Sequence, residues 1–276
     1  MKYSDHEDKR RNPAWQGSFL HPAEMCTLRK CAPCGNVQTG KTGCRYEGEK
    51  KYGLICMEGE MDYQSMFTFM LEMAGTIAFA ASGAMVGAQR GMDIFGVCVL
   101  GVVTAVGGGA TRDIILGIVP PGMFQDPLYT IVATVTSCIV FAVMYWKQEL
   151  LEGGNRLVYD KVMLVMDTVG LGVFTVMGVD KGISQGYMER TFFLVFLGTV
   201  TGVGGGLIRD MMAGVPPYIF VRHIYACASI VGAIACVWIY RLWGGVPAMV
   251  IGTVVVILIR YLAAHYRWNL PRLRRE

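Results

Sequence analysis

Seven long apolar stretches follow one another along the chain, at residues 66–88, 94–111, 127–146, 162–179, 191–208, 224–240 and 242–259. Each can cross a hydrocarbon core of about 30 Å, which takes roughly 17–25 helical residues. Five stretches contain no charged residue, and the other two contain one acid each, Glu72 and Asp167. A soluble core could supply one or two such stretches but not seven in series. The pattern therefore predicts an all-α polytopic membrane protein with seven transmembrane helices.

The first six stretches contain an internal duplication. Four residues of the first stretch recur 95 positions later in the fourth: Glu72, Gly75, Phe79 and Gly83 correspond to Asp167, Gly170, Phe174 and Gly178. The motif Gly-Gly-Gly-x-x-Arg-Asp closes the second stretch and recurs 97 positions later in the fifth. Because each copy has three stretches, an odd number, the second copy enters the membrane from the opposite side. We predict two inverted three-helix repeats, residues 66–150 and 160–241, followed by a seventh helix and basic tail at 242–276.

Three successive glycines stand near the end of the second and the fifth stretch, where a membrane helix should be finishing. In one interpretation the helix breaks there and restarts as a half-helix. Its free N–H groups would receive a carboxylate, while the released carbonyls suit a cation. In the other interpretation the glycines only allow two helix backbones to pack closely. We favour the break, because the triplet occurs twice and is followed each time by Arg-Asp.

The predicted substrate or ion path combines these glycines with the charged residues that the two copies share. It comprises Gly107, Gly108, Gly109, Arg112, Asp113 and Glu72 in the first copy, and Gly204, Gly205, Gly206, Arg209, Asp210 and Asp167 in the second. Each arginine can pair with an aspartate of either copy or bind an anion directly, and Glu72 and Asp167 can bind a cation or proton or cap an entry vestibule. The stretches contain no nucleophile–base pair and no metal-ligand cluster. We therefore expect a non-enzyme without metal or cofactor.

The first sixty residues are a different kind of sequence, polar and with five of the nine cysteines. Residues 35–42 match the phosphate-binding loop pattern, but neither flank reads as the strand and helix that such a loop requires. We interpret the match as coincidental. Cys31 and Cys34 form one half of a zinc knuckle without a second half. We expect a disordered tail at 1–60, with metal binding, disulfides or a later translation start as alternatives.

The formal net charge of +4 comes from basic residues that lie between apolar stretches rather than on one face. We therefore expect no nucleic-acid partner. Basic residues that flank the stretches, among them Arg209 and Arg260, are more numerous on the side of the C-terminus than on the side of Arg112 and Lys181. The positive-inside rule then predicts an external N-terminus and a cytoplasmic C-terminus.

The doubled motif V-T-x-V-G-G-G-x-x-R-D, followed each time by G-x(1–2)-P-P, resembles the bacterial glycine-transporter-domain family. That family is similar to the trimeric intracellular cation channels. The resemblance covers about residues 66–265. It implies a homotrimer in the bacterial inner membrane, with a path inside each protomer rather than on the threefold axis.

The two branches of this resemblance imply different cargo. From the channels it implies conduction of monovalent cations along the second and fifth helices. However, Arg112 and Asp113 stand where the animal channels carry Lys-Glu-Val. We therefore expect a plasma-membrane transporter for glycine or a similarly small amino acid, and we retain a trimeric potassium channel as the alternative.

Overall fold

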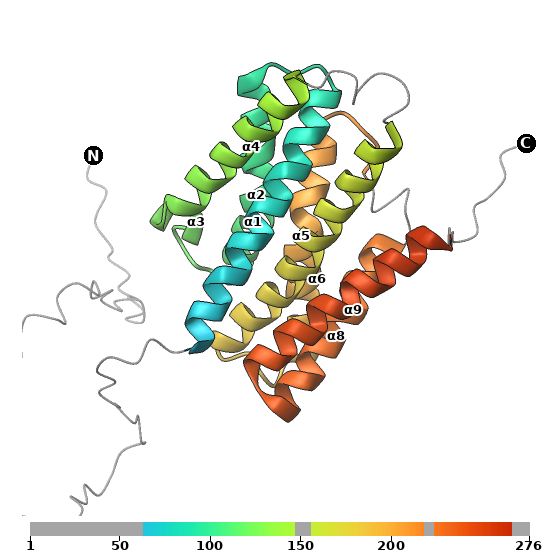
Figure 1. Cartoon of the computed structure of the whole chain (residues 1–276). Coiled ribbons are helices and arrows are strands. Elements are labelled where there is room, and N and C mark those ends of the chain that lie inside the picture. Colours follow the sequence, from blue (N-terminus) through green and yellow to red (C-terminus); the bar gives the residue numbers. More distant parts are fainter. Residues whose placement is uncertain (1–62, 147–155, 218–223, 267–276) are drawn as a thin grey trace, which may run out of the picture. The chain divides into compact units, whose positions relative to one another are not determined.

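The computed structural model describes residues 63–146, 156–217 and 224–266, and Figure 1 shows the helices that they form. Among these residues, seven helices are long and apolar enough to cross a membrane, which confirms the predicted fold class. They are α1 Tyr63–Gln89, α2 Ile94–Ile115, α4 Leu128–Trp146, α5 Arg156–Ser184, α6 Thr191–Met212, α8 Ile224–Trp243 and α9 Gly245–His265, with a short α3, Gly122–Gln125, before α4. The tail at 1–60, with its loop match and its cysteines, lies outside the described residues.

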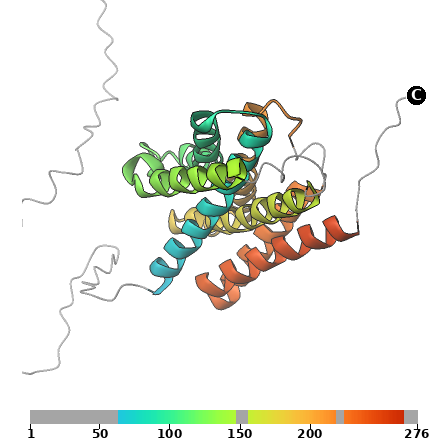
Figure 2. The ribbon, with the colours of Figure 1, turned by 45° about the horizontal axis from the view of Figure 1, so that its top comes forward.

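The helices of the two sequence copies make the same contacts within each copy. Helix α1 packs against α2 and α4, and α5 packs against α6 and α8. Contacts of α1 with α5 and of α2 with α6 join the two sets, while α9 packs on α8 and α5. Helices α1 and α5 run in opposite directions in Figure 1, and α4 and α9 lie on opposite flanks of the bundle in Figures 1 and 2. This arrangement is consistent with inverted repeats.

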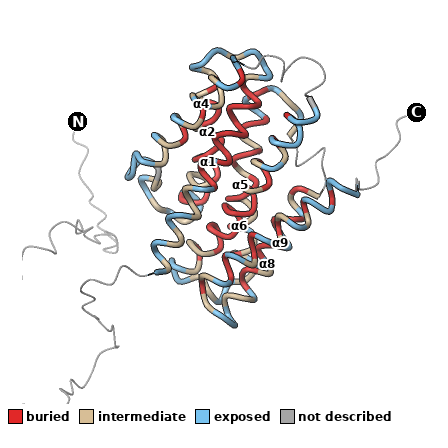
Figure 3. The backbone as a smooth tube through the Cα atoms, in the orientation of Figure 1, coloured by how far each residue is buried: buried red, intermediate tan, exposed pale blue. Residues whose placement is uncertain are grey.

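The buried core of the bundle runs along α1 and α5 (Figure 3). Phe79 and Phe174, which are equivalent in the two copies, stack there with their ring centroids 5.2 Å apart. Each ring lies against a glycine of the other copy, Phe79 against Gly170 and Phe174 against Gly75. Small residues thus let the two copies interlock, which is a common mode of helix association in membranes.

Helices α2 and α6 end in the same way, just beyond their Arg-Asp pairs. Gly117 and Gly214 follow with positive φ angles of 73° and 64°, which glycine adopts at little steric cost. The amide of the next residue donates to the carbonyl oxygen of Asp113 at 2.8 Å, or of Asp210 at 3.0 Å. These bonds form a Schellman motif, and two prolines follow that do not continue the helix. The sequence Gly-x(1–2)-Pro-Pro therefore fixes where both helices stop.

The prediction of half-helices at the glycine triplets is wrong. Helix α2 continues without interruption through its triplet to Ile115, and α6 continues through its own to Met212. A continuous helix keeps each backbone N–H and C=O hydrogen-bonded, which matters most where no water can replace the lost bonds. No free N–H groups are therefore available at the triplets to receive a carboxylate.

The glycines instead bring two helix backbones into contact. A Cβ atom placed on Gly108 would collide with the carbonyl oxygen of Thr201 on α6, and would lie 3.3 Å from the backbone nitrogen of Gly205. A Cβ atom on Gly205 would collide in turn with the carbonyl oxygen of Thr104 on α2. The packing interpretation of the triplets is therefore the correct one, and α2 and α6 cross at Gly108 and Gly205.

This crossing predicts a sharp difference between neighbouring glycines of one triplet. Gly108→Ala should destabilise the protein by about 1–3 kcal/mol, because the added methyl meets rigid backbone. Gly109→Ala is the matched control, since its nearest new neighbour is the Arg112 guanidinium at 3.9 Å. Alanine is also the better helix former by about 0.5–1 kcal/mol. Equilibrium unfolding in detergent would measure both, and equal stability of the two variants would contradict a backbone crossing at Gly108.

Candidate functional site

The two copies each bring four polar side chains together from three helices. In the first copy they are Glu72 on α1, Arg112 and Asp113 on α2, and Tyr129 on α4; in the second they are Asp167 on α5, Arg209 and Asp210 on α6, and Tyr225 on α8. We call these sets the first and the second cluster. The last turns of α2 and α6 supply the Arg-Asp pairs, directly beyond the crossing at Gly108 and Gly205.

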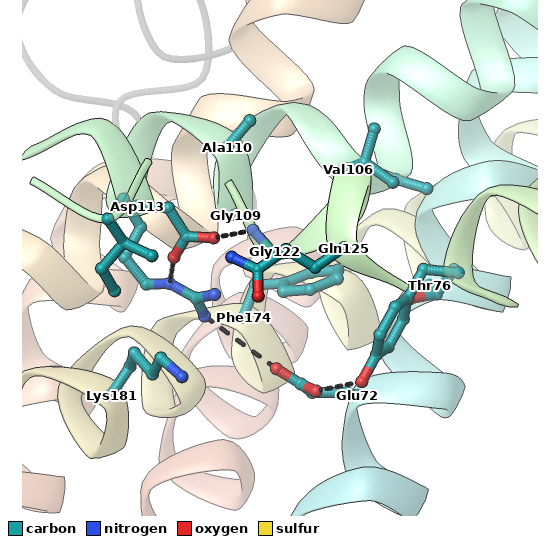
Figure 4. A pocket seen from close by; sticks show the side chains of 14 residues that line it. Glu72, Thr76, Val106, Gly109, Ala110, Asp113, Gly122, Gln125, Phe174 and Lys181 are labelled. Carbon is teal, nitrogen blue, oxygen red and sulfur yellow. Dashed lines mark hydrogen bonds and ion pairs between the residues drawn. The ribbon is translucent and has the colours of Figure 1, made fainter. Parts of the chain in front are cut away.

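The first cluster is tied together by short hydrogen bonds (Figure 4). The Arg112 Nε donates to Asp113 Oδ1 at 2.9 Å, and the other oxygen of Asp113 accepts the Gly122 amide at 2.8 Å, which attaches α3 to α2. The Tyr129 hydroxyl donates to Glu72 Oε2 at 2.7 Å. Arg112 Nη1 lies 4.0 Å from Glu72 Oε1, at the limit of an ion pair. Glu72 thus takes its hydrogen bond from the tyrosine and not from the arginine.

Two cavities adjoin the first cluster. A cavity of about 220 Å³ is lined by the cluster itself together with Thr76, Gly109, Gln125 and Lys181, among others. A wider cavity of about 400 Å³ is lined by Gln64, Ser65, Thr68, Phe69, Glu72, Tyr129, Asp180, Ser184 and Tyr240. Glu72 and Tyr129 belong to both linings, so the hydrogen-bonded pair lies between the two cavities. The wider cavity carries two carboxylates and, among the described residues, no lysine or arginine.

The second cluster is closed. Arg209 is fully buried; its Nε donates to Asp210 Oδ1 at 2.8 Å, its Nη1 donates to Asp167 Oδ1 at 2.6 Å, and Nη1 also donates to Ser82 of α1. A further arginine, Arg260 of α9, places its Nη2 3.7 Å from Asp167 Oδ2. Arg260 and the four cluster residues are each at most 4% exposed. Membrane-buried charges are costly unless paired, and these charges are paired with one another.

Equivalent residues therefore make different contacts in the two clusters. Both arginines bond the aspartate that follows them in the chain, which is one of the two roles predicted for them. The acids differ: Glu72 lies on a cavity wall and is bound by Tyr129, whereas Asp167 is sealed in a pair with Arg209. Of the remaining predicted glycines, Gly107 faces Ile208 and Gly204 faces Gly108 at the crossing. Gly206 faces the Tyr225 hydroxyl of α8, and Gly109 lines the smaller cavity.

Sequence reasoning assigned no role to four groups that the structure places in the clusters or on the cavities next to them. Tyr129 and Tyr225 carried a signal, because they are 96 positions apart within the duplication. Asp180 and Lys181 lie at the polar end of α5, beyond the apolar stretch. No pattern in the sequence distinguished them from other polar residues at a helix end.

A fifth group was misassigned. Arg260 follows the last apolar stretch by one residue and was counted as a flanking charge at the membrane surface. The structure buries it instead between α9 and α5, beside Asp167. Its use in the charge count for orientation was therefore wrong.

The sequence matches a known family of membrane proteins. The profile of the family described as Glycine transporter matches residues 69–145 and 164–241, one segment within each predicted repeat. The UPF0126 inner membrane protein YadS of Escherichia coli K12 is 40% identical over 210 residues, covering 75% of this chain and 96% of the relative. A UPF0126 membrane protein of Vibrio cholerae is 32% identical over 217 residues, covering 78% and 87%.

Solved channel structures have the same fold. A prokaryotic TRIC channel crystallised in 0.5 M KCl superposes with a TM-score of 0.67 at 29% identity, covering 75% of this chain and 100% of the channel. The trimeric intracellular cation channel orthologue from Rhodobacter sphaeroides gives a TM-score of 0.64 at 30% identity, covering 73% and 98%. These likenesses support the predicted alternative, a cation channel, better than they support glycine transport.

The different surroundings of the two acids predict different costs of neutralising them. Asp167→Asn should destabilise the protein by about 3–5 kcal/mol, because it leaves two buried arginines short of a counter-charge. Glu72→Gln is the matched control: its side chain is 23% exposed, and the amide oxygen can still accept the tyrosine hydrogen bond. We expect it to cost less than about 1 kcal/mol. Unfolding titrations in detergent would test this, and equal costs would show that the clusters do not differ as described.

Proposed function

This chain belongs to the Glycine transporter family of membrane proteins, and we propose that it conducts monovalent cations through a path inside each protomer. Its seven apolar helices and its matches make it an integral membrane transport protein. The proposal adds that the transported solute is a monovalent cation.

The acidic lining of the wider cavity carries the proposal. Glu72 and Asp180 face this cavity without a basic residue among the described lining side chains. A recess lined by one sign of charge and walled by low-dielectric protein concentrates ions of the opposite sign. Serine, threonine and tyrosine hydroxyls share the lining, and their oxygens can replace water around a cation. The cavity therefore favours entry of cations over anions.

The path continues past Glu72 into the smaller cavity. There Arg112 is neutralised by Asp113 at 2.9 Å, so its charge does not repel an entering cation as a lone arginine would. The hydrogen bond between Tyr129 and Glu72 spans the junction of the two cavities. A cation that takes over Glu72 as its ligand would have to displace the tyrosine, which makes this pair the constriction of the path.

Glycine is the second candidate cargo, because of one feature of the smaller cavity. This cavity carries Lys181 in addition to Glu72 (Figure 4). An ammonium group and a carboxylate in one cavity of about 220 Å³ suit a small zwitterion. The binding mode differs from the one predicted from sequence, since Lys181 and not a helix N-terminus would receive the carboxylate.

Location and topology complete the proposal. We place the chain in a bacterial inner membrane, as the name of the Escherichia coli relative indicates for that protein. We keep the N-terminus outside and the C-terminus in the cytoplasm, an orientation supported by the flanking basic residues that remain when Arg112, Arg209 and Arg260 are removed from the count. The wider cavity then opens to the outside, since it lies at the end of the bundle where α1 begins.

Neutralising the acidic lining should reduce cation flux. In liposomes containing the purified protein, the double variant Glu72→Gln, Asp180→Asn should lower potassium flux by about tenfold, the low end of what electrostatic focusing contributes. The loss should shrink as salt rises above about 0.1 M, where the screening length is about 10 Å. Glu189→Gln is the control, because Glu189 is an exposed acid at the same end of the bundle outside both linings.

The same liposomes separate the two candidate cargoes. Labelled glycine and potassium flux are measured side by side, with and without an imposed ion gradient. Potassium flux that is indifferent to glycine supports the channel. Saturable glycine entry without potassium leak, abolished by Lys181→Met, would overturn the cation proposal in favour of the zwitterion site.

We also propose a homotrimer, as the name of the Rhodobacter sphaeroides neighbour states for that protein. Both cavities are lined from a single chain, so each protomer would hold its own path. Light scattering of the detergent-solubilised protein during size-exclusion chromatography should give three chains per particle. A monomer that still conducts potassium would disprove the trimer and leave the path within the protomer intact.

A further inference from the structure

Arg260 comes from the one membrane helix that lies outside both sequence copies. It is a buried cation beside the second cluster and has no equivalent in the duplication. Its guanidinium carbon lies 4.8 Å from the centroid of the Tyr225 ring, and its Nη2 lies 3.7 Å from Asp167 Oδ2. A cation over an aromatic face and beside a carboxylate is held by both groups. Arg260 thus occupies a place that is built to hold a positive charge.

That place is incompletely satisfied by the arginine. Asp167 Oδ2, the Tyr225 hydroxyl and the Arg260 Nε and Nη2 are buried and have no hydrogen-bond partner within the described residues. Each such group has lost its hydration without gaining a hydrogen bond in return, which is unfavourable. Several of them in one cluster indicate a site that is better satisfied by other contacts than by those seen here.

The first cluster shows what such contacts are. There the tyrosine hydroxyl donates to the equivalent acid at 2.7 Å and the acid borders two cavities. In the second cluster the equivalent acid, Asp167, accepts its hydrogen bond from Arg209. The Tyr225 hydroxyl has no hydrogen-bond partner among the described residues. The two clusters therefore present an open and a closed form of one arrangement of residues.

Of the two arginines that contact Asp167, Arg260 is the one that can leave. Arg209 is anchored to three side chains on α5, α6 and α1. Arg260 makes a single long ion pair within the described residues. It also lies five residues before the end of α9, within reach of the membrane surface for a long side chain.

We propose that Asp167 and Tyr225 form a second binding site for a monovalent cation, and that the Arg260 guanidinium occupies it here as a tethered cation. When Arg260 withdraws, the carboxylate and the aromatic face accept a mobile cation, and this end of the path opens. The role in the path rests on the proposed cation conduction, whereas binding of a cation at the site does not. The site takes small monovalent cations, guanidinium-type cations among them.

The experiment removes the Arg260 guanidinium by mutation and then supplies a free guanidinium compound in solution. In the full chain, Arg260→Ala should raise potassium flux into liposomes by about tenfold, equivalent to about 1.4 kcal/mol in the closing equilibrium. Millimolar methylguanidinium should restore the low flux of this variant. It should also raise the melting temperature of the variant in detergent, and leave the wild type unchanged. Arg241→Ala is the matched control, because Arg241 is an exposed arginine of α8 outside the cluster.

Further variants keep the test decisive. Arg260→Lys retains a tethered cation and should keep the low flux. Arg260→Met retains most of the side-chain volume, and it replaces Arg260→Ala if the alanine variant does not fold. If methylguanidinium changes neither the flux nor the melting temperature of the Arg260→Ala or Arg260→Met variant, the second site is disproved and Arg260 is a packing residue.

The two proposals fail in different ways. Rescue of the melting temperature by methylguanidinium without potassium flux in any variant would uphold the binding site and reject cation conduction. Potassium flux in the wild type that Arg260→Ala leaves unchanged, with no rescue of stability, would uphold conduction and reject the second site.

Discussion

The contact between the backbones of α2 and α6 at Gly108 and Gly205 positions the two buried Arg-Asp pairs of the protein. Two helices can approach this closely only where neither carries a side chain, and the duplication supplies a glycine on both at the same point. The helices run in opposite directions through the crossing, because each sequence copy contributes three spans. The Arg-Asp pair that follows each glycine by one turn is therefore carried to the opposite side of the crossing. One local contact thus separates two equivalent charge clusters across the bundle.

Both clusters solve the same electrostatic problem, and they solve it differently. A charge within the membrane must be hydrated or paired. The first cluster keeps its acid at the junction of two cavities, with a tyrosine as its partner. The second cluster excludes solvent and pairs every charge with another. In the predicted inverted repeats such a difference is useful, because equivalent residues at the two ends of the path can exchange the open and the closed arrangement without a new fold.

The sequence predicted the seven helices closely, because the thickness of the membrane sets the length of an apolar helix. It was less accurate where the helix continues into water: α5 begins at Arg156, six residues before the predicted stretch, since polar residues continue a helix once it is nucleated. The glycine triplets could not be interpreted from sequence alone. A glycine that breaks its own helix and a glycine that allows a second helix to pack closely have the same sequence pattern. Only the position of the second helix distinguishes them. Arg260 was missed for a related reason, because only the packing of α9 on α5 and α8 brings it from the end of an apolar stretch into the bundle.

The choice of cargo within this family must then depend on the charges that are not already paired. The Arg-Asp pairs neutralise themselves in both clusters, so they cannot by themselves distinguish a cation from a zwitterion. Asp180 and Lys181 are neighbours on α5, yet they line different cavities, the acid in the wide one and the base in the small one. On the proposed path, a solute that enters through the wider cavity meets Asp180 and Glu72 first and Lys181 only afterwards. A cation is therefore drawn in before it meets a positive charge, whereas a zwitterion gains its second contact only once it has passed the pair of Glu72 and Tyr129. A relative that replaces the lysine and keeps the two acids would have the electrostatics of a cation path alone.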